Sequence, residues 1–120
     1  MGEIRLGAVE SHFADIIWEN EPLTSRELVE RAKEELNWNK STTYTILRRL
    51  CEKGIFVNEG GRVSALIPKK DFLAVQSEQF VEETFSGSLP AFIAAFTTRR
   101  KLSKNEIDEL QAMIDSARKE

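Results

Sequence analysis

The sequence predicts a mainly α-helical protein in which three short helices and a two-stranded β-hairpin are followed by further helices. Three observations predict this fold class. Apolar residues recur at helical spacing, a Gly60-Gly61 pair separates two stretches suited to strands, and Pro68 precedes a Phe-rich helical stretch. A length of 120 residues allows one ordinary domain or two small ones. We therefore expect two domains, at residues 1–68 and 69–120.

Two helices are expected in the first third of the chain. One spans residues 8–20 with Gly7 as its N-cap, and Glu21-Pro22 ends it because a residue before proline avoids the helical region. The next begins at a capping box, in which the side chains of Thr24 and Glu27 each accept the other's backbone N–H. The apolar positions of the two helices are Val9, Phe13, Ile16, Ile17, Leu28, Val29, Ala32 and Leu36.

A third helix and a hairpin complete the first domain. Asn39 suits the N-cap of this helix, and Gly54 ends it. Residues 55–57 and 62–67 suit strands joined by the Gly-Gly reversal. The apolar seam of the helix consists of Ile46, Leu47 and Leu50, with Thr43 at its N-terminal edge. Three helices and a wing of two strands make a winged helix-turn-helix, in which the third helix is the recognition helix.

The outward face of the recognition helix differs from an ordinary solvated face. A water-facing helix is usually filled with Glu and Lys, whereas this one offers hydroxyl and guanidinium groups of the kind that reach base edges and phosphates. Residues 40–70 carry seven cations against two anions, a local charge of +5, so the rest of the chain carries −8. This asymmetry is typical of a focused DNA-binding face on a protein that otherwise repels DNA.

We therefore expect sequence-specific binding of duplex DNA. Arg62 at the wing tip would enter a minor groove or hold a phosphate, and the alternative is an ordinary polar turn residue. Phosphate contacts are expected from Lys40, Arg49, Lys53 and Arg62. Base readout is expected from Ser41, Thr42, Tyr44, Thr45 and Arg48.

Two other classes of function fit the sequence less well than DNA binding. A winged-helix module that binds protein instead of DNA would favour an acidic recognition face, and the local charge of +5 argues against it. An enzyme is not predicted, because no nucleophile–base pair and no phosphate-cradling loop is visible. The single histidine, His12, has no supporting cluster of ligands or catalytic partners.

The second domain is rich in phenylalanine. Five of the seven Phe residues, Phe72 among them, fall in the last 50 residues, where Gly87 separates two helical segments and a capping box at Ser103 and Glu106 opens a third. A helical piece of this size cannot bury so many large side chains alone, and the missing surface is most simply a second copy of the chain. The residues predicted to hold the dimer together are Phe80, Phe85, Phe92, Phe96, Leu110 and Ile114.

Several features bear on the location and the remaining chemistry. One cysteine, Cys51, cannot form an internal disulfide, and no apolar run reaches the roughly 18 residues of a membrane span, so we expect a cytoplasmic protein without a membrane partner. No cofactor and no metal is expected. Cys51 is interpreted as a small half-buried residue instead of a redox switch, because a helix C-terminus disfavours a thiolate. Trp18 and Trp38 are interpreted as packing residues instead of base-stacking platforms.

A series of short stretches runs along nearly the whole chain in a specific order. They are Ile16-Ile17-Trp18-Glu19, Pro22-Leu23-Thr24, Trp38, Thr42, Thr45, Arg49-Leu50, Lys53-Gly54, Gly61-Arg62, Phe85-Ser86-Gly87 and Leu102-Ser103-Lys104-Asn105-Glu106-Ile107. In order and spacing they resemble the penicillinase-repressor (BlaI/MecI/CopY) family of dimeric winged-helix repressors. The resemblance implies a transcriptional repressor, a homodimer that places one recognition helix in each half-site of a near-palindromic operator.

The chain departs from that family at positions that concern release and operator choice. Members released by a sensor protease carry an Asn-Phe bond, and the corresponding pair here is Ala95-Phe96, which argues against a protease trigger. Copper-responsive members carry clustered C-terminal cysteines, whereas residues 115–120 contain none. Asn39-Lys40 and Tyr44 also differ from the usual recognition helix. The operator sequence, the inducing signal and the regulated genes are therefore not indicated.

Overall fold

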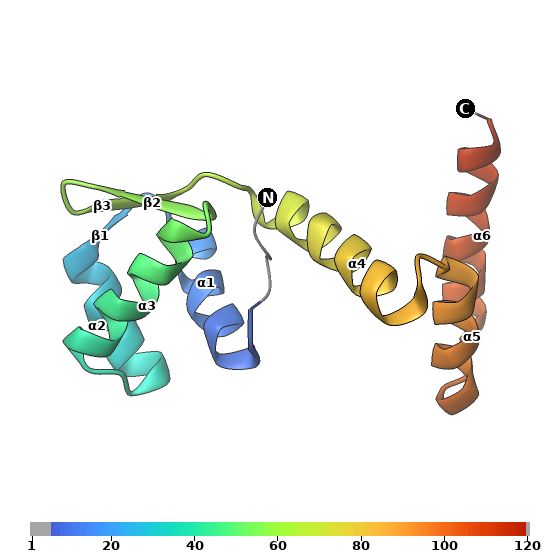
Figure 1. Cartoon of the computed structure of the whole chain (residues 1–120), viewed down its shortest axis with the longest axis horizontal. Helices are drawn as coiled ribbons and strands as arrows, with labels where there is room; N and C mark the ends of the chain where they lie inside the picture. Colours follow the sequence, from blue (N-terminus) through green and yellow to red (C-terminus); the bar gives the residue numbers. More distant parts are fainter. Residues whose placement is uncertain (1–5, 120) are drawn as a thin grey trace. The chain divides into compact units, whose positions relative to one another are not determined.

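The computed structural model describes residues 6–119 and is mainly helical, with a small antiparallel sheet. The expected winged helix-turn-helix followed by further helices is confirmed (Figure 1). The elements, in chain order, are α1 (Ala8–Asn20), β1 (Leu23–Thr24), α2 (Ser25–Leu36), α3 (Lys40–Glu52), β2 (Phe56–Glu59), β3 (Arg62–Ala65), α4 (Lys69–Phe85), α5 (Leu89–Arg99) and α6 (Lys104–Arg118).

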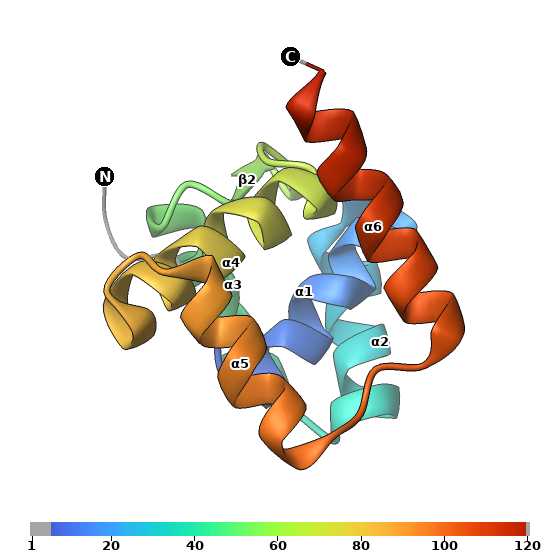
Figure 2. The same ribbon diagram turned by 90° about the vertical axis from the view of Figure 1, so that its right-hand side faces the viewer.

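The chain forms two compact units that meet within α4. The first unit extends to Glu78 and the second begins at Gln79, so residues 69–78 of α4, nearly three turns, belong with the winged helix. In the second unit, α5 and α6 run in roughly opposite directions and are joined by residues 100–103 (Figure 2). The boundary between compact units thus lies later in the chain than the domain boundary predicted at residue 68.

Local capping interactions place the helix starts where the sequence predicts them. The Thr24 hydroxyl accepts the N–H of Glu27 at 3.0 Å, and the Glu27 carboxylate accepts the N–H of Thr24 at 3.2 Å. Asn39 caps α3 by accepting the N–H of Thr42 at 2.8 Å. Gly54 follows α3 with φ +81°, a left-handed conformation that glycine adopts without strain. These caps satisfy backbone donors and acceptors that a helix end leaves unpaired.

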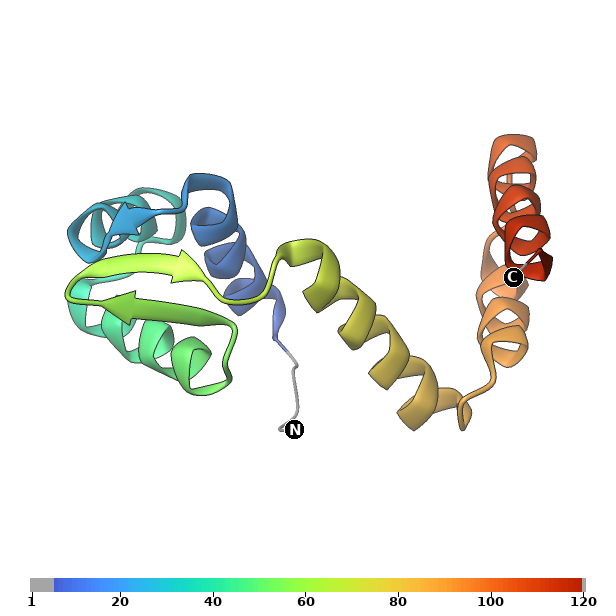
Figure 3. The ribbon, with the colours of Figure 1, turned by 90° about the horizontal axis from the view of Figure 1, so that it is seen from above.

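The wing contains one strand more than the sequence predicts. The strand order is β1-β3-β2, with all pairs antiparallel (Figure 3). The additional strand, β1, pairs Leu23 with Val63 and Thr24 with Arg62. Because this pairing joins residues far apart in sequence, the two-residue strand has no local signal. Because β1 directly precedes α2, its pairing with β3 holds the N-terminus of α2 against the hairpin.

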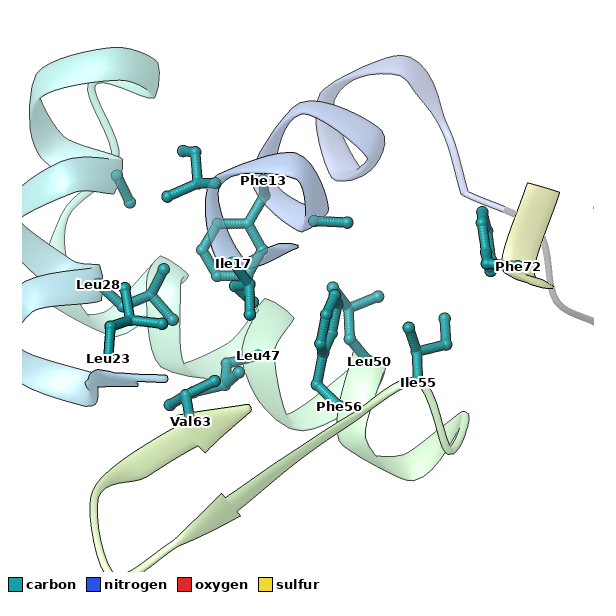
Figure 4. Packing of buried hydrophobic residues seen from close by; sticks show 13 residues of the cluster. Phe13, Ile17, Leu23, Leu28, Leu47, Leu50, Ile55, Phe56, Val63 and Phe72 are labelled. Atoms are coloured by element: carbon teal, nitrogen blue, oxygen red, sulfur yellow. The ribbon is translucent and has the colours of Figure 1, made fainter. Parts of the chain in front are cut away.

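The core of the first unit lies between α1, α2, α3 and the sheet (Figure 4). Its largest buried side chains include Phe13, Leu28, Leu50, Phe56 and Val63. The expectation that Val9 belongs to the apolar face of α1 is wrong, because its side chain is 54% exposed. That position lies at the open first turn of α1, whereas Ala14 is fully buried.

Both tryptophans pack within the first unit. The Trp18 ring lies 5.2 Å from Phe56 and 5.3 Å from Phe72 between centroids, and its indole N–H donates to the carbonyl of Ile67 at 3.0 Å. Trp38 packs against Phe13 at 5.0 Å. Their expected role as packing residues agrees with these contacts. Trp18 in particular attaches the start of α4 to the winged helix.

Phe72 was expected to belong with the C-terminal phenylalanines, and this expectation is wrong. Its side chain is only 2% exposed and lies in the core of the first unit. The Lys69 ammonium also forms an ion pair with Asp15 on α1 at 2.8 Å. The sequence places Phe72 after the Pro68 boundary, but the start of α4 packs against the winged-helix core through this side chain. Four phenylalanines, not five, therefore remain in the second unit.

Candidate nucleic-acid interface

The recognition helix α3 buries one face and presents the opposite face to solvent. Thr43, Leu47 and Leu50 are buried, as helical spacing requires of one stripe. Of the residues predicted to contact DNA, Thr42 and Tyr44 are half-buried. The predicted residues that are exposed on this helix and at its end are Lys40, Ser41, Thr45, Arg48, Arg49 and Lys53. The structure therefore brings most of the predicted set onto one helix with its side chains accessible.

The guanidinium groups of this face are available for an external anion. Arg48, Arg49 and Arg62 are exposed, and none of them forms an ion pair within residues 6–119. The Lys40 ammonium lies over the Tyr44 ring, 6.0 Å from its centroid. The three arginines, which form no ion pair in the described part of the chain, keep their hydrogen-bonding capacity for phosphates and base edges.

The hydroxyl groups of the recognition helix are partly engaged with the backbone. The Thr45 hydroxyl donates to the carbonyl of Ser41 at 3.0 Å, and the buried Thr43 hydroxyl donates to the carbonyl of Asn39 at 3.0 Å. A hydroxyl that donates still has lone pairs, so Thr45 can accept a hydrogen bond from a base amino group. Thr43 is removed from solvent and serves the packing of α3.

The wing presents Arg62 beside a tight turn. Gly60 and Gly61 have φ values of +59° and +91°, which the reversal requires and which glycine adopts readily. The Asn58 side chain accepts the N–H of Gly61 at 3.0 Å and thereby braces the turn. Arg62 starts β3 opposite Glu59, and its side chain remains exposed. The predicted wing-tip cation is therefore accessible on a well-braced hairpin.

Tyr44 bonds to a neighbouring helix. Its side chain is half-buried, like that of Thr42, and its hydroxyl donates to the hydroxyl oxygen of Ser25 on α2 at 3.2 Å. Ser25 begins α2 and was not among the residues predicted from the sequence. The sequence marks Ser25 only as the first residue after the Thr24 cap, and this position does not indicate a contact with the recognition helix. The contact between these residues depends on the tertiary fold.

A hollow of about 450 Å³ lies beside the recognition helix. It is lined by Tyr44, Leu47, Arg48, Cys51, Phe56, Val57, Asn58 and Leu66. The pKa of the Cys51 thiol is raised, first by burial and then by the negative charge of Glu52, despite an opposing hydrogen bond from the Asn58 backbone. A raised pKa disfavours the thiolate, which is the reactive form of a cysteine.

The described part of the chain offers little to a metal ion. Within residues 6–119, no three His, Cys, Asp or Glu side chains come together in a way that could hold one. The Nε2 atom of His12 lies 3.4 Å from a carboxylate oxygen of Glu35, and both side chains are about half exposed. Among the same residues, no helix combines the length and the apolarity needed to cross a bilayer.

The residues predicted for dimerisation divide into two neighbouring sets in the second unit. Phe80, Phe85, Phe92 and Phe96 form a chain of ring contacts with centroids 5.6 to 6.2 Å apart. Phe80 remains 46% exposed and Phe96 40% exposed. Leu110 and Ile114 instead line an apolar groove of about 490 Å³ between α5 and α6. The other groove residues, which the prediction missed, include Leu89, Ile93, Leu102, Ile107 and Met113.

Comparisons with known proteins agree with this geometry. The family model described as penicillinase repressor matches residues 6–116. The penicillinase repressor of Bacillus licheniformis is 25% identical over 115 residues, covering 92% of this chain and 90% of the relative. The methicillin resistance regulatory protein MecI of Staphylococcus aureus (strain Mu50 / ATCC 700699) is 23% identical over 114 residues, covering 92% of this chain and 93% of the relative.

A solved structure supports the fold of the first unit. The solution structure of the DNA-binding domain of the repressor BlaI matches with a TM-score of 0.50 and 24% identity. The match covers 59% of this chain and 93% of that domain. The likeness therefore concerns the winged helix.

Proposed function

The chain belongs to the penicillinase repressor family, and we propose that it represses transcription by binding a near-palindromic operator as a homodimer. Members of this family are DNA-binding repressors and not enzymes, which agrees with the function class predicted from the sequence. One recognition helix would enter the major groove of each half-site. Repression would follow where the operator overlaps a promoter, and the site of action would be the cytoplasm.

The observation that carries the proposal is the set of cations on the recognition helix and the wing. Arg48, Arg49 and Arg62 lie exposed and form no ion pair with any of residues 6–119, on the two elements that a winged helix presents to DNA. The chain as a whole carries −3, so such cations would concentrate affinity on this face. Ser41, Thr45 and Arg48 supply groups able to discriminate bases, whereas Lys40, Arg49 and Lys53 would hold phosphates.

The second unit supports the homodimer part of the proposal. Its phenylalanine cluster and the groove between α5 and α6 leave several large apolar side chains exposed. Contiguous exposed apolar surface of this kind usually marks an interface. A second copy of the chain, docking the same surface, would cover both sets and place two winged helices on one operator.

Release of the operator is proposed not to depend on cleavage at Ala95-Phe96. This peptide lies within α5, where it is held in helical conformation, and it lacks the Asn that precedes Phe in protease-responsive members. A sensor protease is therefore not included among the proposed partners. The proposed partners are duplex operator DNA and a second copy of the chain.

Binding to DNA is tested by selection from a pool of random duplexes, followed by gel-shift titration of the enriched sequence over a range of salt. If the dimer neutralises about six to ten phosphates, the slope of log affinity against log salt should be about −5 to −9. A scrambled duplex of the same length serves as the control. Equal affinity for both duplexes, or a slope near zero, would contradict the proposal.

A further inference from the structure

Ser25 occupies a junction between the recognition helix, the second helix and the wing. It is the first residue of α2, so its backbone N–H is one of the donors that a helix start leaves unpaired. This N–H donates to the carbonyl of Gly61 in the wing turn at 2.7 Å. Its hydroxyl oxygen accepts the Tyr44 hydroxyl from α3 at 3.2 Å. One residue thus bonds to both elements that carry the exposed arginines.

The turn of the wing lies within van der Waals distance of Ser25. A Cβ atom placed on Gly61 would lie 3.6 Å from the Ser25 hydroxyl oxygen, and the φ of +91° at Gly61 disfavours any other residue there. The strand pairing of Thr24 with Arg62 lies directly beside this contact. The start of α2 therefore holds the turn from which Arg62 projects.

Tyr44 is held on the other side of the junction. Its side chain is half-buried, and the Lys40 ammonium lies over its ring. A phenol hydroxyl that already donates to Ser25 has no proton left for a base acceptor. Partial burial and the bond to a residue of α2 distinguish Tyr44 from Thr45 and Arg48, whose side chains are exposed.

We infer that Ser25 and Tyr44 are positioning residues that set the wing relative to the recognition helix, so that Arg62 and Arg48 meet DNA at a fixed separation. Tyr44 then acts through Ser25, and it does not read a base as the sequence prediction assumed. The inference rests on the proposed DNA binding, since it concerns how specificity is achieved. Loss of the junction should reduce the preference for the operator over other duplexes, because two contacts would no longer be held in mutual register.

A double-mutant cycle tests the inference in the full-length chain. Tyr44→Phe removes the donor, and Ser25→Ala removes the acceptor while keeping the backbone bond to Gly61. Each should lower the ratio of operator to scrambled-duplex affinity by about 2- to 12-fold, the usual range for one hydrogen bond. The double variant should lose no more than the larger single loss, because both changes break the same contact. Ser25→Thr, which keeps a hydroxyl, should retain most of the preference.

Three outcomes of the cycle would overturn the inference. Losses that multiply in the double variant would mean that Tyr44 and Ser25 contact DNA independently. Unchanged preference in both single variants would mean that the junction has no influence on specificity. A Ser25→Thr variant as poor as Ser25→Ala would mean that the hydroxyl is not the cause.

A measurement without DNA separates failure of this inference from failure of the proposed function. Backbone amide resonances of Gly61 and Arg62 should shift in Tyr44→Phe, whose changed side chain lies on a different element. Thr45→Ala is the matched control, since Thr45 neighbours Tyr44 but bonds only within α3, and it should leave the wing resonances in place. Wing resonances that do not move in Tyr44→Phe would overturn the coupling, whereas wild-type protein that selects no duplex would overturn only the proposed function.

Discussion

In the first unit, helices and sheet enclose a continuous core in which Phe13, Leu28 and Phe56 are almost completely removed from water. In the second unit, neither α5 nor α6 contains a buried residue, and side chains as large as Phe80 and Ile114 remain about half exposed. Both units consist mainly of helices. They differ in burial: the first unit covers its large apolar side chains with its own elements, whereas the second unit leaves many of them exposed.

This difference indicates how the two units are stabilised. Burial of apolar surface contributes about 25 cal/mol per Å², so the first unit has its own source of stability, whereas a piece as short as residues 79–120 has little. Exposed apolar side chains in the second unit become stabilising only when another surface covers them. We therefore expect the first unit to fold alone and the second to depend on its partner copy. The predictions below test this contrast, from the largest expected effect to the smallest.

The largest effect is expected from deleting the second unit. A chain ending at Glu78 should remain folded and monomeric, and its operator affinity should fall by about 10²- to 10⁴-fold, because the two winged helices are no longer tethered. Sedimentation and gel-shift titration measure the two consequences. A truncation after Lys70, which also removes Phe72, is the informative comparison and should be less stable. Full operator affinity of the chain ending at Glu78 would contradict the tethering role.

Phe72→Ala should destabilise the first unit by about 3–5 kcal/mol, the usual cost of truncating a buried phenylalanine. Denaturant unfolding followed by tryptophan fluorescence measures this, since Trp18 and Trp38 both lie in the first unit and the Trp18 ring is 5.3 Å from that of Phe72. Phe80→Ala on the same helix is the matched control and should change this transition little, because Phe80 belongs to the second unit. Equal destabilisation by both substitutions would mean that the division within α4 does not separate two cores.

Ile114→Lys should weaken the dimer by about 10- to 100-fold in dissociation constant, because a side chain worth about 1.5–3 kcal/mol on burial is replaced by a charge. Ser116→Lys adds the same charge to α6 at a position outside the groove, and it should leave the dimer intact. Analytical ultracentrifugation over a range of concentration distinguishes the two. Weakening of the dimer by Ser116→Lys alone would show that the groove is not the interface.

The surface of the first unit, in contrast to that of the second, should act through charge. Arg48→Ala should cost about 1–3 kcal/mol and relax preference at one base position, as expected for a side chain that reads guanine. Arg62→Ala should weaken all duplexes more evenly, as expected for a phosphate contact or for a groove-width sensor. Competition titration against single-base operator variants measures both. Binding unaffected by either substitution would mean that another face contacts DNA.

Local features of the fold could be predicted from the sequence, and long-range ones could not. The caps at Thr24 and Asn39 and the Gly60-Gly61 turn depend on neighbouring residues, and the structure confirms all of them. Strand β1 was missed because its two residues pair with β3 across the fold. Phe72 was misassigned because helical spacing shows that a residue is apolar but not which core it joins.

The same distinction applies to the candidate site. Helical spacing identified the exposed arginines of α3, since one buried stripe determines the opposite face. It did not reveal that Tyr44 turns toward Ser25, nor that Leu89 and Ile107 line a groove with Leu110. Each of these contacts joins two helices, and their relative placement is determined by tertiary packing.

The smallest effect is expected at the loop between α5 and α6. The pKa of Glu106 lies below its ordinary value of 4.5, first because the Ser103 backbone N–H donates to its carboxylate and then because Arg100 does. A carboxyl whose pKa is lowered by folding contributes stability above its unfolded pKa, and this contribution is lost as the pH falls through the folded pKa.

Glu106→Gln isolates that charge, because glutamine retains the capping-box hydrogen bond. Wild type should therefore be slightly more stable than the variant near neutral pH, and the difference should shrink as the pH falls below about 4.5. Thermal unfolding of both proteins over this range measures the difference. Asp108→Asn, which removes an exposed carboxylate from the same helix, is the control and should show no such dependence. A constant difference between wild type and Glu106→Gln at every pH would mean that the Arg100 and Ser103 contacts do not depend on the carboxylate charge.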